Sequence, residues 1–344
     1  MPVYYDKRFF DYVIADRYYR RVKAIGCNLW DKAMRIKYHM PVPANKSSTE
    51  STRRSRGLAA LGASTPLFRR WQKSAFISYS ADEIIQDLLD YQPKILRASA
   101  SYLRLVAEAL VDQGIDDLHL KAASTVGELM DEPTRHFIES AFGCPVFNEY
   151  GAAEVGSIGR ECQQKEGFHE HSDFVILEVI KNGEPAAPGE VGDIVVTGLL
   201  NYAMPIIRYR VGDIGVLGDH LCSCGSAFPL LKSVEGRSID SFILPDGSAV
   251  TAKEVMTVIQ GTPGVSRYCA VQESVDKVRI ELMARPRDPP VAVDELVAKC
   301  HGLLGDDVEV QVSITDRKNL KAKFRPVISK LTVAGDPRWT KPRR

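Results

Sequence analysis

The sequence predicts an α/β protein in which a large domain is followed by a small α+β domain. Between residues 80 and 150, short apolar segments that are typical of buried strands alternate with segments of helical periodicity, which favours a parallel sheet covered by helices. From about residue 174 the pattern changes to alternating β-strands. Beyond Gly236 a compact unit of strands and helices follows, so we expect the domain boundary near residues 237–240.

The large domain is expected to begin with a helix over residues 5–25, because apolar positions recur there every three or four residues. Residues 40–75 are rich in loop formers and carry the basic run 53–56, which indicates an exposed loop or, alternatively, a domain boundary. Ser80 and Glu83 form a capping box that begins a helix. The elements expected next are strands at 93–99, 118–124 and 144–150 and helices at 101–113 and 132–142, the last with Pro133 in its first turn.

The second half of the chain is expected to be rich in β-structure. Asn182-Gly183 predicts a hairpin turn after a strand at 174–180, and a further strand is expected at 193–197. The expected elements of the small domain are strands at 241–244, 267–272, 278–284 and 308–314 and helices at 252–260 and 293–304.

Composition excludes several classes of protein. The 344 residues are 44% hydrophobic and carry a net charge of +1, which indicates an ordinary globular protein without an electrostatic footprint for nucleic acid. No apolar stretch approaches the roughly 20 residues that span a bilayer, and no signal peptide is recognisable, so neither a membrane nor secretion is expected. Seven scattered cysteines argue against a disulfide framework and favour a cytoplasmic protein with free thiols and one metal site.

A first segment, Glu149-Tyr150-Gly151-Ala152-Ala153-Glu154, follows a predicted parallel strand, where ligands bind in such sheets. Tyr150 offers an aromatic face to adenine. Gly151 lets the backbone approach a ligand closely. Glu154 is placed to bind Mg²⁺, which prefers carboxylate and phosphate oxygens.

Two further segments follow in order, 208–213 and 235–240. Asp213 can accept hydrogen bonds from both ribose hydroxyls, and Arg237 can donate to ribose or phosphate. Each segment alone is weak evidence for a nucleotide site, since a Gly-Asp pair is usually a turn. Three in this order, between an α/β region and a small domain, indicate an enzyme that uses ATP.

With these motifs the chain resembles the adenylate-forming superfamily, and within it the phenylacetate–coenzyme A ligases and CapK-like proteins, over roughly residues 75–330. The resemblance implies that Tyr150 and Glu154 bind adenine and Mg²⁺, and that Asp213 binds ribose. It also implies that Asp240, after Glu235-Gly236-Arg237, is a hinge residue.

The resemblance further implies how the domains are divided. Residues 1–237 match an adenylation domain with a β-rich subdomain at about 155–235, residues 238–335 match a small mobile domain, and 336–344 form a tail. Family members rotate the small domain between two half-reactions, and its lysine bridges acyl and phosphate oxygens. Lys323 fits that catalytic lysine best, although Ala322 stands where the family has glycine. Lys321 is the second choice, and exposed lysines on a solvated loop are the alternative.

Cysteine spacing predicts a structural zinc site. Cys222 and Cys224 form a tight pair, and Cys162 lies upstream with His169 and His171 after it. Three cysteines and one histidine are a closed tetrahedral zinc set. The CapK-like branch often carries such a set, and His169 matches it better than His171. The alternative is free thiols on a loop. The other cysteines, at 27, 144, 269 and 300, lie in apolar or helical contexts and are expected in the core.

Family members hold ATP phosphates with a Ser/Thr/Gly-rich loop, whose backbone N–H groups cradle the phosphates. Residues 62–66 have such a composition but lie in the wrong place with too few glycines. Met1–Tyr5 resemble the residues that follow the loop in the family. The sequence therefore leads us to expect a chain truncated at its N-terminus.

The resemblance implies activation of a carboxylic acid, with an aryl acid favoured, to an acyl-adenylate and transfer to coenzyme A. The implied cofactors are ATP, Mg²⁺, coenzyme A and structural Zn²⁺, and the partners are small molecules; whether the chain forms a homodimer is left open. One alternative is an adenylating enzyme that passes the acyl group to an amine or carrier in polysaccharide metabolism. The other is an inactive truncated homologue or a binding subunit.

Overall fold

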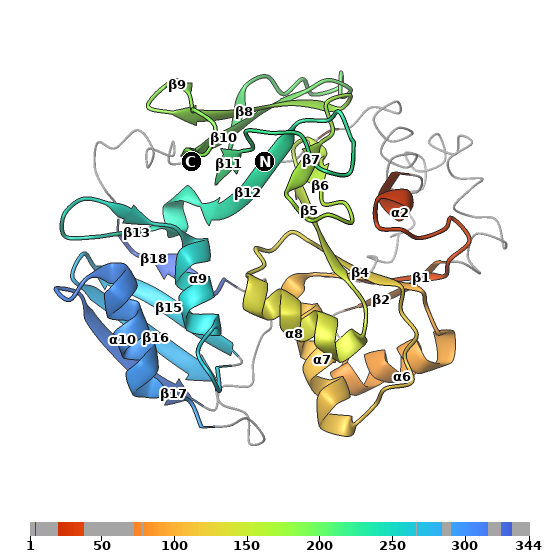
Figure 1. Cartoon of the computed structure of the whole chain (residues 1–344), viewed down its shortest axis with the longest axis horizontal. Coiled ribbons are helices and arrows are strands. Elements are labelled where there is room, and N and C mark those ends of the chain that lie inside the picture. Colours follow the sequence, from red (N-terminus) through yellow and green to blue (C-terminus); the bar gives the residue numbers. More distant parts are fainter. Residues whose placement is uncertain are drawn as a thin grey trace, which may run out of the picture.

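The computed structural model shows a twelve-stranded mixed sheet and a separate four-stranded sheet (Figure 1). The described residues are 4, 20–37, 72–76, 79–265, 267–283, 290–315 and 325–331. The large sheet has the strand order β2-β1-β3-β4-β5-β6-β7-β12-β11-β10-β8-β9. Its first five strands, β2 (Gln72–Phe76), β1 (Ala33–Lys37), β3 (Ile95–Ala98), β4 (Ala122–Val126) and β5 (Val146–Ala152), are mutually parallel.

Both faces of the parallel half are buried. Three helices cover one face, α6 (Ala81–Tyr91), α7 (Ala100–Gln113) and α8 (Glu132–Phe142). On the other face the segment after the short helix α2 (Arg21–Ala24) packs Ile25 and Cys27 against Ile95 and Phe147. Burial from both sides explains why all four residues of β3, including Arg97, are buried rather than every second one.

Capping residues fix the helix ends. Ser80 and Glu83 form the expected capping box at the start of α6. Gly114 ends α7 in the left-handed conformation, and Asp131 caps α8 by accepting from Thr134 N. The bounds predicted for α8 are confirmed, with Pro133 in its first turn.

The β-rich region continues the same sheet with antiparallel strands. These are β6 (Gly156–Arg160), β7 (Phe168–Glu170), β8 (Val175–Lys181), β9 (Glu184–Pro185), β10 (Val191–Gly198), β11 (Tyr209–Leu217) and β12 (Leu230–Arg237). The predicted hairpin is confirmed, since Asn182 and Gly183 join β8 and β9 with φ angles of 54° and 89°.

The small unit has its own apolar core. Its sheet, in the order β17-β16-β15-β18, comprises β15 (Arg267–Ser274), β16 (Lys277–Met283), β17 (Glu309–Thr315) and β18 (Val327–Ser329), and α9 (Ala252–Gln260) and α10 (Val293–Leu304) contribute to the same core. A two-stranded ribbon, β13 (Phe242–Ile243) with β14 (Ala249–Val250), and the 3₁₀ turn η3 (Ser238–Asp240) connect it to β12. The bounds predicted for α9 and α10 are confirmed.

The predicted α/β class is confirmed, with one strand misplaced. The segment expected as a strand at 118–124 begins pairing only at Ala122, opposite Ile95. Leu118 and Leu120 contribute to the core without joining the ladder, so burial rather than pairing explains their apolar character. Of the helix expected at 5–25 the structure describes residues 20–25, of which Arg21–Ala24 form α2. The loop expected at 40–75 is wrong at its end, because residues 72–75 belong to β2, and the rest of it lies outside the described residues.

No helix among the described residues is long and apolar enough to span a membrane.

Candidate functional site

The two main motifs face each other across the large sheet. Tyr150 lies near the end of β5, and Asp213 lies on β11 in the antiparallel half. The Tyr150 hydroxyl donates to Asp213 Oδ2 over 2.9 Å. Conversely, the Tyr209 hydroxyl of the second motif donates to Glu154 Oε1 of the first over 3.0 Å. Each motif therefore supplies a tyrosine that orients the carboxylate of the other.

Burial limits what Tyr150 can do in this arrangement. Its residue is only 8% exposed, and its ring packs edge-on against Phe168. Burial, followed by the nearby Asp213 carboxylate, raises the pKa of the Tyr150 phenol, so the hydroxyl stays protonated and donates. An adenine can reach little of this ring, and the hydroxyl already occupies one Asp213 oxygen.

Arg237 stands opposite Asp213 in the register of β11 and β12. Its Nε lies 3.9 Å from Asp213 Oδ1, and its side chain is half exposed, so the guanidinium is accessible to a ligand. The preceding Gly236 has a φ of 111°, and a Cβ there would lie 2.9 Å from the Ala252 Cβ of α9. Only glycine satisfies both constraints, so the motif also sets how closely the small unit approaches β12.

Gly151 is required by the neighbouring strand. A Cβ at this position would lie 2.5 Å from the Gly156 carbonyl oxygen. Since β5 and β6 are antiparallel neighbours, this contact keeps the turn that carries Glu154 tight. The sequence analysis expects glycine here because a ligand approaches the backbone. The structure gives a second reason, which is the close contact with β6.

A buried ion pair supports the end of β5. Arg135 of α8 binds Glu161 with both guanidinium nitrogens, Nη2 to Oε1 over 2.7 Å and Nη1 to Oε2 over 2.9 Å. Glu161 also accepts from the backbone N of Asn148 over 2.7 Å, and Asn148 lies two residues before Tyr150. This support links the nucleotide motif to Cys162, the residue after Glu161.

We expect Glu161→Gln to lower the free energy of unfolding by about 3 kcal/mol, because it leaves the buried Arg135 charge with only the exposed Glu132 carboxylate, 3.3 Å from its Nε. Urea denaturation measures the change. Glu190→Gln is the matched control, since Glu190 pairs with an exposed lysine at the surface and should change stability by less than about 0.5 kcal/mol. Equal losses in both variants would contradict a supporting role for Glu161.

The expected hinge residue Asp240 lies in η3, is buried, and pairs with Arg325. Lys323 and Lys321 lie outside the described residues.

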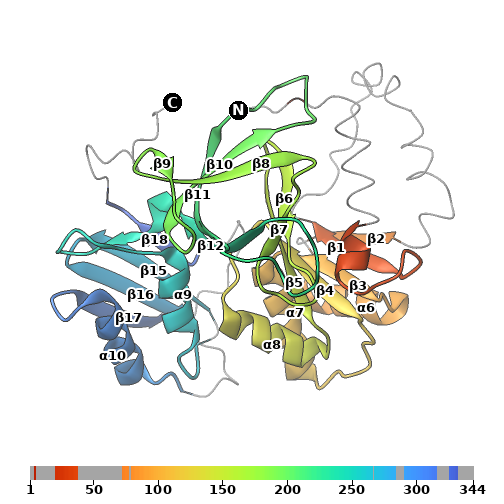
Figure 2. The same cartoon turned by 45° about the horizontal axis from the view of Figure 1, so that its top comes forward.

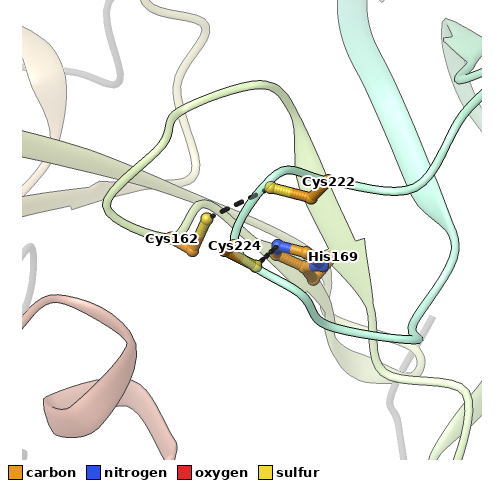
Figure 3. A group of neighbouring side chains, drawn as sticks. All are labelled: Cys162, His169, Cys222 and Cys224. Atoms are coloured by element: carbon orange, nitrogen blue, oxygen red, sulfur yellow. Dashed lines mark hydrogen bonds between the residues drawn. The ribbon is translucent and has the colours of Figure 1, made fainter.

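The four expected zinc ligands come together (Figure 3). The ligand atoms of Cys162, His169, Cys222 and Cys224 all lie within 4.8 Å of one another. Cys162 Sγ is 3.6 Å from Cys222 Sγ, and Cys224 Sγ is 3.4 Å from His169 Nε2. Pairing of β7 with β12, in which His169 stands opposite Leu230, brings the two halves of the set together. His171 instead packs against Phe174.

The donor set fits a closed zinc site. Burial lowers the pKa of His169, which favours the neutral imidazole that a metal requires. Burial raises the pKa of the Cys222 thiol to about 12, so without a cation this thiol stays protonated. Cys27, Cys144 and Cys300 are buried as expected, whereas Cys269 is only partly buried.

Two functional contacts were missed from the sequence. One is made by Tyr209, which lies within the 208–213 segment, and the other by Glu161, which precedes Cys162. The signal for Tyr209 is its place in Tyr209-Arg210-Val211-Gly212-Asp213, four residues before the motif's carboxylate on the same strand. No sequence signal links Glu161 to Arg135.

Comparison with solved structures identifies the fold of the chain. The chain has the fold of adenylate-forming CoA ligases: it matches a crystal structure of 2-hydroxyisobutyryl-CoA ligase in the postadenylation state with a TM-score of 0.73 at 19% identity. The match covers 92% of this chain and 69% of that one. An amide bond synthetase from Marinactinospora thermotolerans matches with a TM-score of 0.61 at 15% identity, over 90% of this chain and 61% of that one.

In sequence, the chain is similar to phenylacetate-coenzyme A ligases and to CapK, which confirms the predicted resemblance. It is 29% identical over 230 residues to the phenylacetate-coenzyme A ligase of Thermus thermophilus, covering 62% of this chain and 52% of that protein. It is 26% identical over 202 residues to protein CapK of Staphylococcus aureus, covering 58% of this chain and 44% of that protein. The chain thus spans about half the length of these curated relatives. No family model matches it.

Proposed function

We propose that this chain carries the ribose and metal side of an AMP-forming acid–thiol ligase, which activates a carboxylic acid with ATP and transfers it to coenzyme A. The observation that carries the proposal is the crosswise pairing of Tyr150 with Asp213 and of Tyr209 with Glu154. It gathers two oriented carboxylates at the carboxyl end of a parallel sheet, where such folds bind ligands. The relatives named above support the reaction class, and an aryl acid remains the favoured substrate class.

Each residue has a defined task in this proposal. Asp213 accepts from the ribose hydroxyls, through Oδ1 or after displacing the Tyr150 hydroxyl from Oδ2. Arg237 donates to ribose or phosphate from the rim. Glu154, whose Oε1 is held by Tyr209, presents a carboxylate oxygen to Mg²⁺, which when bound neutralises charge on the phosphates. Lys323 is proposed as the lysine that contacts the reacting groups from the small domain.

Exchange of labelled pyrophosphate into ATP across a panel of aryl and aliphatic carboxylic acids tests the reaction class. We expect exchange that depends on one class of acid and on Mg²⁺. Calorimetric titration of AMP tests nucleotide binding separately and needs no acid. Absence of both exchange and AMP binding would contradict the proposal and favour an inactive homologue.

We also propose that Cys162, His169, Cys222 and Cys224 hold one structural Zn²⁺. The four ligand atoms leave no open position for a substrate, as in closed structural sites. Its task is to tie the 162–169 segment to the loop that precedes β12, the strand that carries Arg237.

A second candidate is transfer of the activated acyl group to an amine. The similarity of fold to an amide bond synthetase shows that the fold serves that chemistry elsewhere. Adding coenzyme A, or an amine panel, to an acid that supports pyrophosphate exchange separates the two outcomes by their products.

A further inference from the structure

An ion-pair hub joins the large and small units away from the linker. Glu108 of α7 accepts from Arg104 Nε over 3.0 Å and from Arg267 Nη2 of β15 over 3.2 Å. The Glu108 side chain is 3% exposed and that of Arg267 is 18% exposed. Arg104 is held further by the ring of Phe137, whose centroid lies 4.8 Å from its guanidinium carbon. Nearer the linker, Lys253 of α9 pairs with Glu235 of β12.

A cavity beside this hub is large enough to hold water. α8 and α9 lie side by side (Figures 1 and 2), and the cavity next to them is lined from both units, by Arg104, Asp131 and Thr134 on one side and Gln260, Arg267 and Tyr268 on the other. The volume that the centres of water molecules can occupy in this cavity is about 60 Å³. This is enough for several waters, because each needs roughly 10–15 Å³ of such volume.

Tyr268 marks this contact as one that can open. Its hydroxyl is buried and has no hydrogen-bond partner among the residues that the structure describes. Burial raises the pKa of this phenol, so it remains a donor that needs water. Separation of the two units would solvate it, which favours opening.

The hub can break without leaving a charge stranded. If the small unit moves away, Glu108 keeps Arg104, four residues earlier on the same helix, and Arg267 passes into water. The large cost of breaking a buried ion pair, an unpaired charge left inside the protein, is therefore avoided. Contacts between domains of one chain are commonly of this polar, reversible kind.

We propose that Glu108 and Arg267 form a reversible latch that positions the small unit against α7 and so sets the balance between the two half-reactions. The functional consequence rests on the ligase activity proposed above. The latch itself depends only on the contacts described, and it can be tested without any catalysis.

The test compares Arg267→Met with Arg279→Met in the full chain. Arg279 lies on the neighbouring strand β16 and pairs with Glu273 inside the small unit, so it controls for loss of a surface arginine. Hydrogen exchange followed by mass spectrometry should show about tenfold faster exchange in the 100–113 and 252–260 peptides of Arg267→Met, with the core strands unchanged. Arg267→Lys should restore part of the protection.

With an active enzyme, two rates are compared: pyrophosphate exchange, and thioester formation from a preformed acyl-adenylate. The change that Arg267→Met causes in one rate should differ at least about fivefold from the change in the other. A merely structural residue would lower both rates equally. Two results would overturn the latch. One is unchanged hydrogen exchange in the 100–113 and 252–260 peptides, and the other is an equal change in the rates of both half-reactions. If no acid supports activity, the hydrogen-exchange result still decides on the latch while the proposed reaction fails separately.

Discussion

Asp213→Asn is expected to weaken AMP binding by roughly 100-fold. In the proposed site Asp213 accepts hydrogen bonds from two ribose hydroxyls, and each hydrogen bond to a charged group contributes about 1.5 kcal/mol or more. Two such bonds give about 3 kcal/mol, which corresponds to roughly two factors of ten in affinity. The amide offers one acceptor and carries no charge, and it also loses the pairing with Arg237 Nε, 3.9 Å away. Calorimetric titration with AMP measures the loss.

Two companion variants make this result specific. Asp193→Asn removes a carboxylate from the adjacent strand β10, where it pairs with Arg210 over 3.4 Å, and should leave AMP affinity within about twofold. Tyr150→Phe removes the hydroxyl that occupies Asp213 Oδ2 and should weaken AMP binding by less than about fivefold, since the ribose gains that oxygen. Wild-type affinity in Asp213→Asn would remove Asp213 from the site.

The sequence predicted those elements best whose signals are local. Helices α8 and α9 begin and end where capping residues, a proline or a glycine mark them, and α10 ends before Gly305. The hairpin turn follows from Asn182-Gly183. The strand expected at 118–124 failed because an apolar residue such as Leu118 can fill the core without a pairing partner. Whether a segment joins a ladder depends on a distant strand, here β3, which local periodicity does not report.

In the candidate site, too, local sequence predicts the residues but not the contacts between distant strands. Residue type and order sufficed to single out Tyr150, Glu154 and Asp213, because carboxylates and an aromatic ring are what a nucleotide and Mg²⁺ require. The crosswise hydrogen bonds depend on how β5 and β11 face each other, although three strands separate them in the sheet order. The same holds for the Glu108–Arg267 hub, whose partners lie 159 residues apart in sequence.

Cys222→Ser is expected to release about one equivalent of zinc and to lower the melting temperature by roughly 10 °C. A metal held by four protein ligands contributes its binding free energy to folding, and loss of such a site is among the few single changes that cost more than about 4 kcal/mol. For a chain of this size each kcal/mol shifts the melting temperature by about 2–4 °C. Because Cys222 is buried and lies 3.6 Å from Cys162, serine cannot replace it as a thiolate ligand. Metal analysis and calorimetry measure the two effects.

The matched control is Cys269→Ser, which changes the same side chain at a partly buried position outside the cluster. It should keep full zinc and melt within about 3 °C of the wild type. Zinc release should also increase as the pH falls, because protons compete with the metal for the thiolates and for His169. If Cys222→Ser loses no metal, or the purified chain holds well under one zinc per molecule at neutral pH, the four side chains are only neighbours. In that case the loop before β12 is held by the pairing of β7 with β12 and by the hydrogen bonds from Ser223 to Glu166.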